Sequence, residues 1–192
     1  MKFISNIKVS KKLLLLFVPG IVALLALLAL FIFQTNSISK QTKKAYYDEA
    51  FVSTAKILNA DRDYYQAALA EKELVLSPNI DATLKKALIA DYKKNIEEDM
   101  EVRITGAVDN VKGNTELYSE FKESSTGKTL ETLYADFTKH LASWKNSFDV
   151  NTLTGNINTH LAAFDDARAD INAMTQLFEE YAEYKSTAIT ED

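Results

Sequence analysis

The first feature of the hydrophobic pattern is an uncharged run from Leu13 to Phe33, about 21 residues long. As a helix rising 1.5 Å per residue, the run would span roughly 32 Å, enough to cross a hydrocarbon core of about 30 Å. The lysines that precede it, with no acidic residue among them, place the N-terminus in the cytoplasm, although Lys40, Lys43 and Lys44 weaken this asymmetry. A cleaved signal would have a shorter apolar region and end in small residues, so an uncleaved anchor is favoured.

After this run, hydrophobic residues recur at helical spacing, and short polar segments with Pro or Gly separate the predicted helices. No Pro or Gly occurs from Thr35 to Leu76, and this stretch is predicted as one helix that ends at Ser77-Pro78-Asn79. A second helix is predicted from an N-cap at Asp81 to about Lys112, with Gly113 as its stop. The apolar positions taken as inward-facing on these two helices are Tyr47, Phe51, Leu58, Tyr65 and Leu69, and then Leu84, Leu88, Tyr92, Ile96 and Met100.

Two further helices are predicted after a connection at 113–128 that contains a short helical piece at Glu116–Lys122. The third spans about Lys128 to Phe148 and presents Leu130, Leu133, Phe137, Leu141 and Trp144 on one face. In the fourth, a seam of alternating four- and three-residue steps resembles a heptad pattern with two polar members. Its positions are Ile157, Leu161, Phe164, Arg168, Ile171, Thr175 and Phe178.

Helices that are each amphipathic and alternate in direction pack most simply as an antiparallel bundle. The predicted fold class is therefore all-α, with one N-terminal transmembrane helix continuous with an antiparallel four-helix-bundle extracytoplasmic sensor domain. The expected parts are a cytoplasmic basic leader (1–12), the transmembrane helix (13–33) and the sensor domain (35–192). Because the last helix returns toward the membrane, a second membrane helix and a cytoplasmic signalling part are expected beyond this sequence.

Composition narrows the functional classes. The chain has no cysteine, which excludes disulfides, thiolate metal sites and thiol catalysis. It carries 27 acidic against 22 basic residues, and four of the lysines precede the anchor, so the exterior part is acidic and nucleic-acid binding is not expected.

The candidate ligand site rests on three arginines, Arg62, Arg103 and Arg168, each with apolar neighbours at helical spacing. A guanidinium binds a carboxylate or phosphate through two parallel hydrogen bonds, and Tyr64, Tyr65 and Thr175 could add neutral hydrogen bonds. An anionic small molecule is the expected ligand of such a site. The alternative is a structural ion-pair layer, since several aspartates are close in sequence. These are Asp61, Asp63, Asp99, Asp165 and Asp170.

Two segments resemble ligand-binding motifs but lack required residues at the required spacing. Gly127-Lys128-Thr129 lacks the glycine five positions earlier that a phosphate-binding loop needs. A calcium loop beginning at Asp149 would have His160 where its bidentate acid belongs. The two histidines, His140 and His160, are interpreted as boundary-facing residues rather than metal ligands. No catalytic residue, metal or cofactor is expected, and the chain is not expected to be an enzyme.

Three segments, Ile7–Leu14, Leu58–Ala67 and Phe164–Ile171, resemble parts of bacterial methyl-accepting chemotaxis proteins with a four-helix-bundle sensor domain. The resemblance implies a homodimeric receptor in the bacterial inner membrane whose periplasmic domain detects a small-molecule ligand or a ligand-loaded periplasmic binding protein. It further implies that displacement of the fourth helix reaches a cytoplasmic adaptor and kinase through the C-terminal part. Related bundles also serve histidine kinases and cyclic-dinucleotide enzymes, and a purely structural membrane-tethered spacer is the remaining alternative.

Overall fold

The computed structural model describes the backbone of residues 9–77 and 79–191, and the side chains of residues 17–44, 47–77 and 79–187. Most of the expected basic leader, Pro78 and Asp192 lie outside the described backbone. Contacts divide the chain into two compact units, Met1–Lys43 and Lys44–Asp192. With 85% of residues helical and 4% in strands, the all-α prediction is confirmed.

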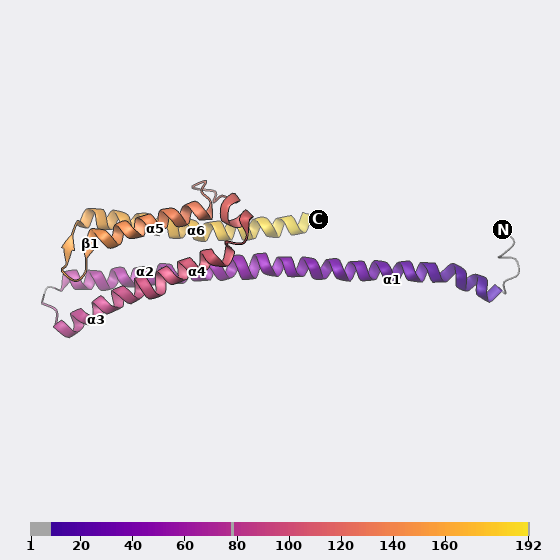
Figure 1. Ribbon diagram of the computed structural model, residues 1–192, viewed down its shortest axis with the longest axis horizontal. Helices are drawn as coiled ribbons and strands as arrows, with labels where there is room; N and C mark the ends of the chain where they lie inside the picture. Colours follow the sequence, from indigo (N-terminus) through magenta and orange to yellow (C-terminus); the bar gives the residue numbers. More distant parts are fainter. Residues whose placement is uncertain (1–8, 78, 192) are drawn as a thin grey trace. The chain divides into compact units, whose positions relative to one another are not determined.

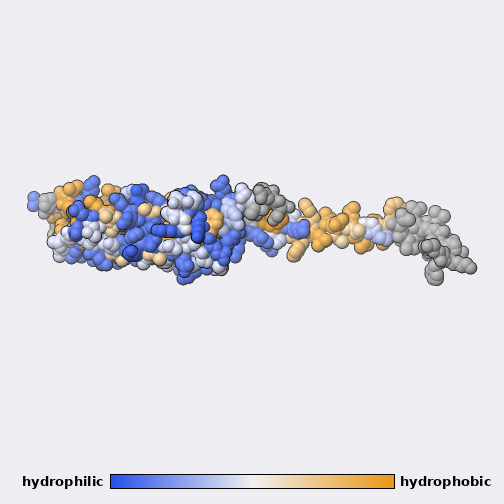
Figure 2. Space-filling model, turned by 90° about the horizontal axis from the view of Figure 1, so that it is seen from above, coloured by the Kyte–Doolittle hydropathy of each residue, from blue (hydrophilic) through white to orange (hydrophobic). Residues whose placement is uncertain are grey.

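The first unit consists of helix α1, Val9–Thr42. From Phe17 to Phe33 its described side chains are exposed, and Figure 2 shows them as a mainly hydrophobic surface. By length and composition this helix could cross a membrane.

The second unit contains the remaining elements, of which Figure 1 labels α2 to α6 and β1. The symbol η denotes π-helical geometry. Each helix predicted from the sequence is present, and the second one is continuous from 82 to 111 but includes a π-helical stretch. In chain order the elements are η1 Lys43–Phe51, whose first residue belongs to the first unit, α2 Val52–Leu76, α3 Ala82–Lys93, η2 Lys94–Met100, α4 Glu101–Val111, η3 Glu116–Glu120, α5 Leu130–Ser147, β1 Phe148–Asp149, β2 Thr154–Gly155 and α6 Ile157–Glu191.

Local signals explain where several of these helices begin. The side chain of Asp81 accepts hydrogen bonds from the backbone N–H groups of Thr83 (2.7 Å) and Leu84 (3.3 Å), which confirms the predicted N-cap. The same hydrogen bonds lower the pKa of Asp81. Helix α5 is capped in the same way by Thr129, whose hydroxyl accepts from the Thr132 N–H.

Neighbouring helices of the second unit run in opposite directions. Along α2, the residues Asp61, Tyr65 and Glu71 contact α6 at Arg168, Phe164 and His160, so one number rises as the other falls. The same reversal relates α2 to α4, where Ser53, Lys56 and Asp63 bond to Ala107, Gly106 and Arg103.

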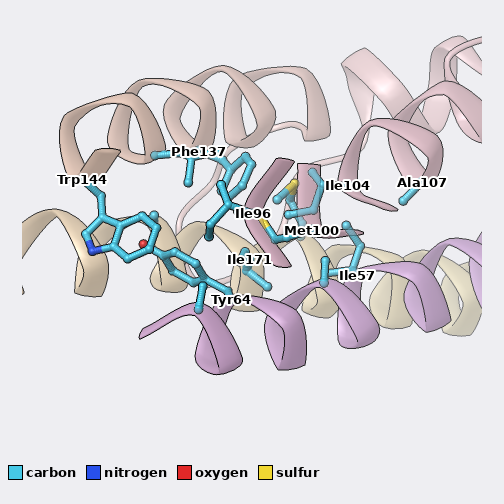
Figure 3. Packing of buried hydrophobic residues seen from close by; sticks show 14 of the residues in the cluster. Ile57, Tyr64, Ile96, Met100, Ile104, Ala107, Phe137, Trp144 and Ile171 are labelled. Carbon is cyan, nitrogen blue, oxygen red and sulfur yellow. The ribbon is translucent and has the colours of Figure 1, made fainter. Parts of the chain in front are cut away.

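A continuous hydrophobic core lies among these helices (Figure 3). The predicted face of α5 is buried throughout, and Trp144, at 1% exposure, is a core residue as expected. The residues labelled in Figure 3 come from α2 (Ile57, Tyr64), η2 and α4 (Ile96, Met100, Ile104, Ala107), α5 (Phe137, Trp144) and α6 (Ile171).

The prediction of which face of α2 is buried is wrong. Leu58, Tyr65 and Leu69 are 55%, 38% and 62% exposed, and Tyr47 and Phe51 of η1 are also exposed. The helix instead buries a narrower stripe that includes Ala60, Ala67 and Ala70 alongside Ile57, Tyr64 and Leu74. The alanines on this stripe allow close packing against the neighbouring helices, and Ile57, Tyr64 and Leu74 fill the core between them, while Leu58 and Leu69 remain outside it.

The prediction that the N-terminal part of the α6 seam is buried is also wrong. The same holds for the first position of the predicted α3 face. Ile157 and Leu161 are 48% and 57% exposed, whereas Ile171 and Phe178 farther along the seam are buried as predicted. Leu84 near the start of α3 is 46% exposed. These positions lie at helix starts, where fewer neighbouring elements are available to cover them.

A short β-hairpin links α5 to α6. Phe148 pairs with Gly155 and Asp149 with Thr154, in antiparallel register. A Cβ on Gly155 would lie 2.2 Å from the Ser147 carbonyl oxygen and 2.7 Å from the Phe148 Cα. Glycine is therefore required there by backbone contact.

Candidate functional site

Two of the predicted site residues meet on one buried carboxylate. Asp63 is 2% exposed, and its Oδ2 accepts a 2.6 Å hydrogen bond from the Nε of Arg103 across the α2–α4 contact. Its Oδ1 accepts from the Nη2 of Arg62 at 3.0 Å. Arg103 also lies 3.7 Å from Asp99. Charge-assisted pairs of this kind satisfy both lone-pair regions of a carboxylate that burial would otherwise destabilise.

The third arginine lies on the other side of α2. The Nε of Arg168 is 3.4 Å from Asp61 Oδ1, and its guanidinium carbon is 4.5 Å from the centre of the Tyr65 ring. Both atoms of this ion pair are shielded from solvent, yet neither has a well-directed hydrogen bond among the described residues. The pair is thus held by charge attraction and by the cation–π contact with Tyr65.

Thr175, the last predicted site residue, does not join the arginines. Its hydroxyl donates to the carbonyl of Ile171 on its own helix at 3.1 Å, and its side chain lines an open groove of about 420 Å³ between α2 and α6. The other residues lining this groove are Leu58, Asp61, Ile171, Asn172, Gln176, Glu179, Glu180 and Glu183. Four of them are acidic, which makes the groove unfavourable for an anion.

The geometry therefore brings Arg62 and Arg103 together, places Arg168 with Tyr65 separately, and leaves Thr175 in an acidic groove. Each of the three guanidinium groups has a carboxylate partner within the chain. Among the aspartates considered as alternatives, Asp61, Asp63 and Asp99 make these pairs. Arg62 keeps the most accessible side chain, 56% exposed, against 36% for Arg103 and 38% for Arg168.

The histidines form a second group of polar contacts that sequence reasoning missed. His160 is 2% exposed, so its interpretation as a boundary-facing residue is wrong. Its Nε2 lies 2.8 and 2.9 Å from the two carboxylate oxygens of buried Glu71, and its Nδ1 lies 3.0 Å from the Trp144 carbonyl. His140, which is partly exposed, pairs with Asp170 through Nδ1 at 2.7 Å. Burial raises the pKa of Asp170 against the opposing effect of His140.

An aromatic cluster surrounds the His160–Glu71 pair. Trp144 stacks on the His160 ring, with centroids 5.2 Å apart, and Tyr64 packs edge-on against Trp144 at 4.8 Å. The Tyr64 hydroxyl is fully buried and lacks a hydrogen-bond partner in the described part of the chain. Its burial, with Tyr92 and Glu71 nearby, raises the pKa of Tyr64. The side-chain periodicity of α2 did not predict this cluster, because a glutamate such as Glu71 is expected at the surface of a helix.

The turn that precedes α5 is built around another buried carboxylate. Glu123 is fully buried and accepts hydrogen bonds from the N–H groups of Ser125 and Thr126 at 2.8 and 2.7 Å and from the Thr126 hydroxyl. Burial alone would raise the pKa of Glu123, but these donors together hold it at about 2. Gly127, with φ of +68°, closes the turn, so the Gly127-Lys128-Thr129 motif is a capping turn here.

Comparison with known proteins gives no match, whether with protein families, with curated proteins or with solved structures.

Proposed function

We propose that this chain is the sensor region, with its membrane anchor, of a chemotaxis-type transmembrane receptor that acts as a homodimer in the bacterial inner membrane. The observation that carries the proposal is an uninterrupted helical path. Residues 9 to 76 are helical at every position, with a membrane-length apolar segment at one end and α2 of the helical domain at the other. A receptor of this kind has the membrane segment followed directly in the chain by its sensing domain, and the elements here follow in that order.

In this proposal the stretches 44–76, 82–111, 130–147 and 157–187 form an antiparallel four-helix bundle outside the cytoplasm. The opposite order of contacts along α2, α4 and α6 supports that arrangement. The acidic character of the chain beyond the anchor agrees with a soluble periplasmic domain.

The exposed face of α2 supports homodimer formation. Leu58, Leu69 and Leu76 lie seven or eleven residues apart, a spacing that keeps them on one side of a helix, and each is more than half exposed. Two copies anchored in one membrane would bring these faces together in parallel. Arg62 lies on the same face by spacing, so a ligand that bridges two copies could reach its guanidinium. A small organic anion or a ligand-loaded binding protein is the proposed stimulus.

A cysteine crosslinking experiment tests the dimer. The chain has no cysteine, so Leu69→Cys introduces one reactive group per copy, and Lys86→Cys at an exposed position of α3 is the matched control. With the full chain in lipid nanodiscs that admit two copies, oxidation should crosslink Leu69→Cys rapidly and the control slowly. Equal rates for both variants would contradict pairing through α2.

A ligand screen tests sensing. Amino acids, organic acids and other metabolites are added to the full chain in detergent micelles while thermal unfolding is followed. A ligand at 100 times its Kd stabilises by about 2.7 kcal/mol, which raises the midpoint of unfolding visibly. Arg62→Ala should abolish the shift produced by an anionic compound, and Lys86→Ala should retain it. If no compound shifts the midpoint, direct sensing is contradicted, and purified periplasmic proteins become the next ligands to test.

A membrane-tethered spacer is the second candidate, and one observation favours it. All three guanidinium groups are already paired with aspartates of the same chain, as an ion-pair layer that fixes helix register would require. A spacer predicts crosslinked dimers without a response to any small molecule or periplasmic protein.

A further inference from the structure

A polar network connects the start and the end of the second unit. At its centre is Asn114, which follows α4 and lies outside the helices. Its Nδ2 donates to the Glu49 carboxylate of η1 at 2.6 Å and to the Tyr181 hydroxyl of α6 at 3.1 Å. Its Oδ1 accepts from the Leu117 N–H at 3.2 Å and so caps η3. One side chain therefore bonds to three separate elements.

The partners of Asn114 are held in place by burial and charge. Glu49 is 7% exposed and Tyr181 is 1% exposed. The Tyr181 hydroxyl donates to Glu116 at 3.1 Å, and Glu116 pairs with Lys185 one helical turn farther along α6. These bonds lower the pKa of Glu116, chiefly through Lys185. Glu49 has a second partner in Lys44, whose ammonium group lies 3.6 Å away.

A second asparagine, one turn earlier, holds the same segment. Asn110 donates to the backbone carbonyl of Asp48 at 2.6 Å and to the Ser53 hydroxyl at 3.1 Å. The bonded carbonyl belongs to the π-helical stretch η1, and π-helical turns occur often at functional positions. Asn110 thus stabilises the unusual geometry of η1 at the point where Asn114 binds it.

We propose that Asn114 couples the position of α6 to that of η1. Any displacement of α6 along or around its axis near Tyr181 must either carry the Glu49 segment with it or break the Asn114 bonds. The bond to Glu49 is short, at 2.6 Å, and Glu49 and Tyr181 are both buried, so carrying the segment along is the less costly course for small displacements. A signalling role for this coupling rests on the proposed receptor function, whereas the coupling of α6 to η1 does not depend on that function.

Asn114→Asp is the most informative substitution. Aspartate keeps the oxygen that caps Leu117 but loses the amide donor and places a second carboxylate against Glu49. The double variant Glu49→Gln/Asn114→Asp reverses the donor and the acceptor, because the amide introduced at position 49 can then donate to the carboxylate introduced at position 114. Asn146→Asp, at an exposed position of α5, is the control for the change of residue type.

The measurement is the distance between spin labels attached to cysteines introduced at Asp48 and Glu183, two exposed positions on η1 and α6. The full chain is placed in nanodiscs and diluted with unlabelled native chain, which contains no cysteine, so that pairs within one copy dominate. The native background and Asn146→Asp should give one narrow distance distribution. Asn114→Asp should lose that single peak, and the double variant should recover it.

Amide hydrogen exchange provides a second readout. Residues 44–51 and 181–187 should exchange at least about tenfold faster in Asn114→Asp, while the core of α5 stays protected, since the substitution removes a hydrogen bond to a buried charge. An unchanged distance distribution in Asn114→Asp, or the absence of recovery in the double variant, would overturn the proposal. Because the measurement uses no ligand and reads distances within one copy, this result is independent of whether the chain proves to be a receptor.

Discussion

Replacing Asp63 by asparagine should destabilise the helical domain, and the size of the effect follows from its two arginine partners. The Arg103 bond is short, at 2.6 Å, and reaches a carboxylate whose side chain is 3% exposed. A hydrogen bond between charged groups of this kind contributes about 1.5 to 3 kcal/mol. The Arg62 pair is worth less, about 0.5 kcal/mol, because its guanidinium side is mostly solvated. The substituted amide would retain one acceptor oxygen, so we expect a net loss of about 2 kcal/mol.

For a helical domain of this size, about 2 kcal/mol corresponds to a fall in Tm of roughly 4–8 °C. Denaturant unfolding of the full chain in micelles, followed by the fluorescence of the single tryptophan, buried Trp144, gives the free energy of unfolding directly. A double-mutant cycle with Arg103→Met should show a coupling of about 1.5 kcal/mol, and a cycle with Arg62→Met less than about 0.5 kcal/mol.

Two results would refute this reasoning. A coupling below about 0.5 kcal/mol between Asp63 and Arg103 would mean that the desolvation of the pair cancels its attraction. Equal couplings for Arg62 and Arg103 would mean that solvent exposure does not distinguish the two pairs.

The other predictions concern the two connections that flank α5. The pKa of Glu123 is held at about 2 in the folded chain, below its ordinary value, so its stabilising contribution is complete above pH of about 4.5 and is lost as the pH falls toward 2. Glu123→Gln should therefore flatten the acid limb of a stability–pH profile measured by denaturant unfolding, and an acid limb identical to the native one would contradict the assignment. Gly155→Ala should cost more than about 2 kcal/mol, since a Cβ would overlap the backbone at Ser147 and Phe148. Asn156→Ala, next along the chain, should be milder in the same melts, and a smaller loss for Gly155→Ala would show that the hairpin relaxes.

The sequence predicted the helices well because their ends carry strong local signals. Asp81 caps α3 as expected, and the α5 face from Leu130 to Trp144 is buried as its periodicity indicated. The pairing of Arg103 and Arg168 with aspartates was also foreseeable, as one of two alternatives, from the short list of charged residues near them. Local pattern and composition were sufficient for these features.

Features that depend on tertiary partners were not predictable in this way. Helix α2 has two candidate faces, and periodicity favoured the one with Leu58 and Leu69 over the buried one, where alanines alternate with Ile57, Tyr64 and Leu74. Which face is buried depends on the volume that the other helices supply, and a single helix does not encode that volume. His160 and Glu71 are 89 positions apart, so nothing in either local sequence indicates their contact.

The contacts between η1–α2 and α4 have an implication for evolutionary studies of this chain. Ser53 donates to the carbonyl of Ala107, Lys56 to that of Gly106, and Asn110 to that of Asp48. In each case one partner is a backbone oxygen, which every amino acid provides. Mutation of the acceptor residue therefore need not be compensated by the donor, and these neighbours should show little covariation. Contact prediction from correlated substitutions would therefore miss these three contacts and would link the two segments mainly through side-chain pairs such as Asp63 with Arg103.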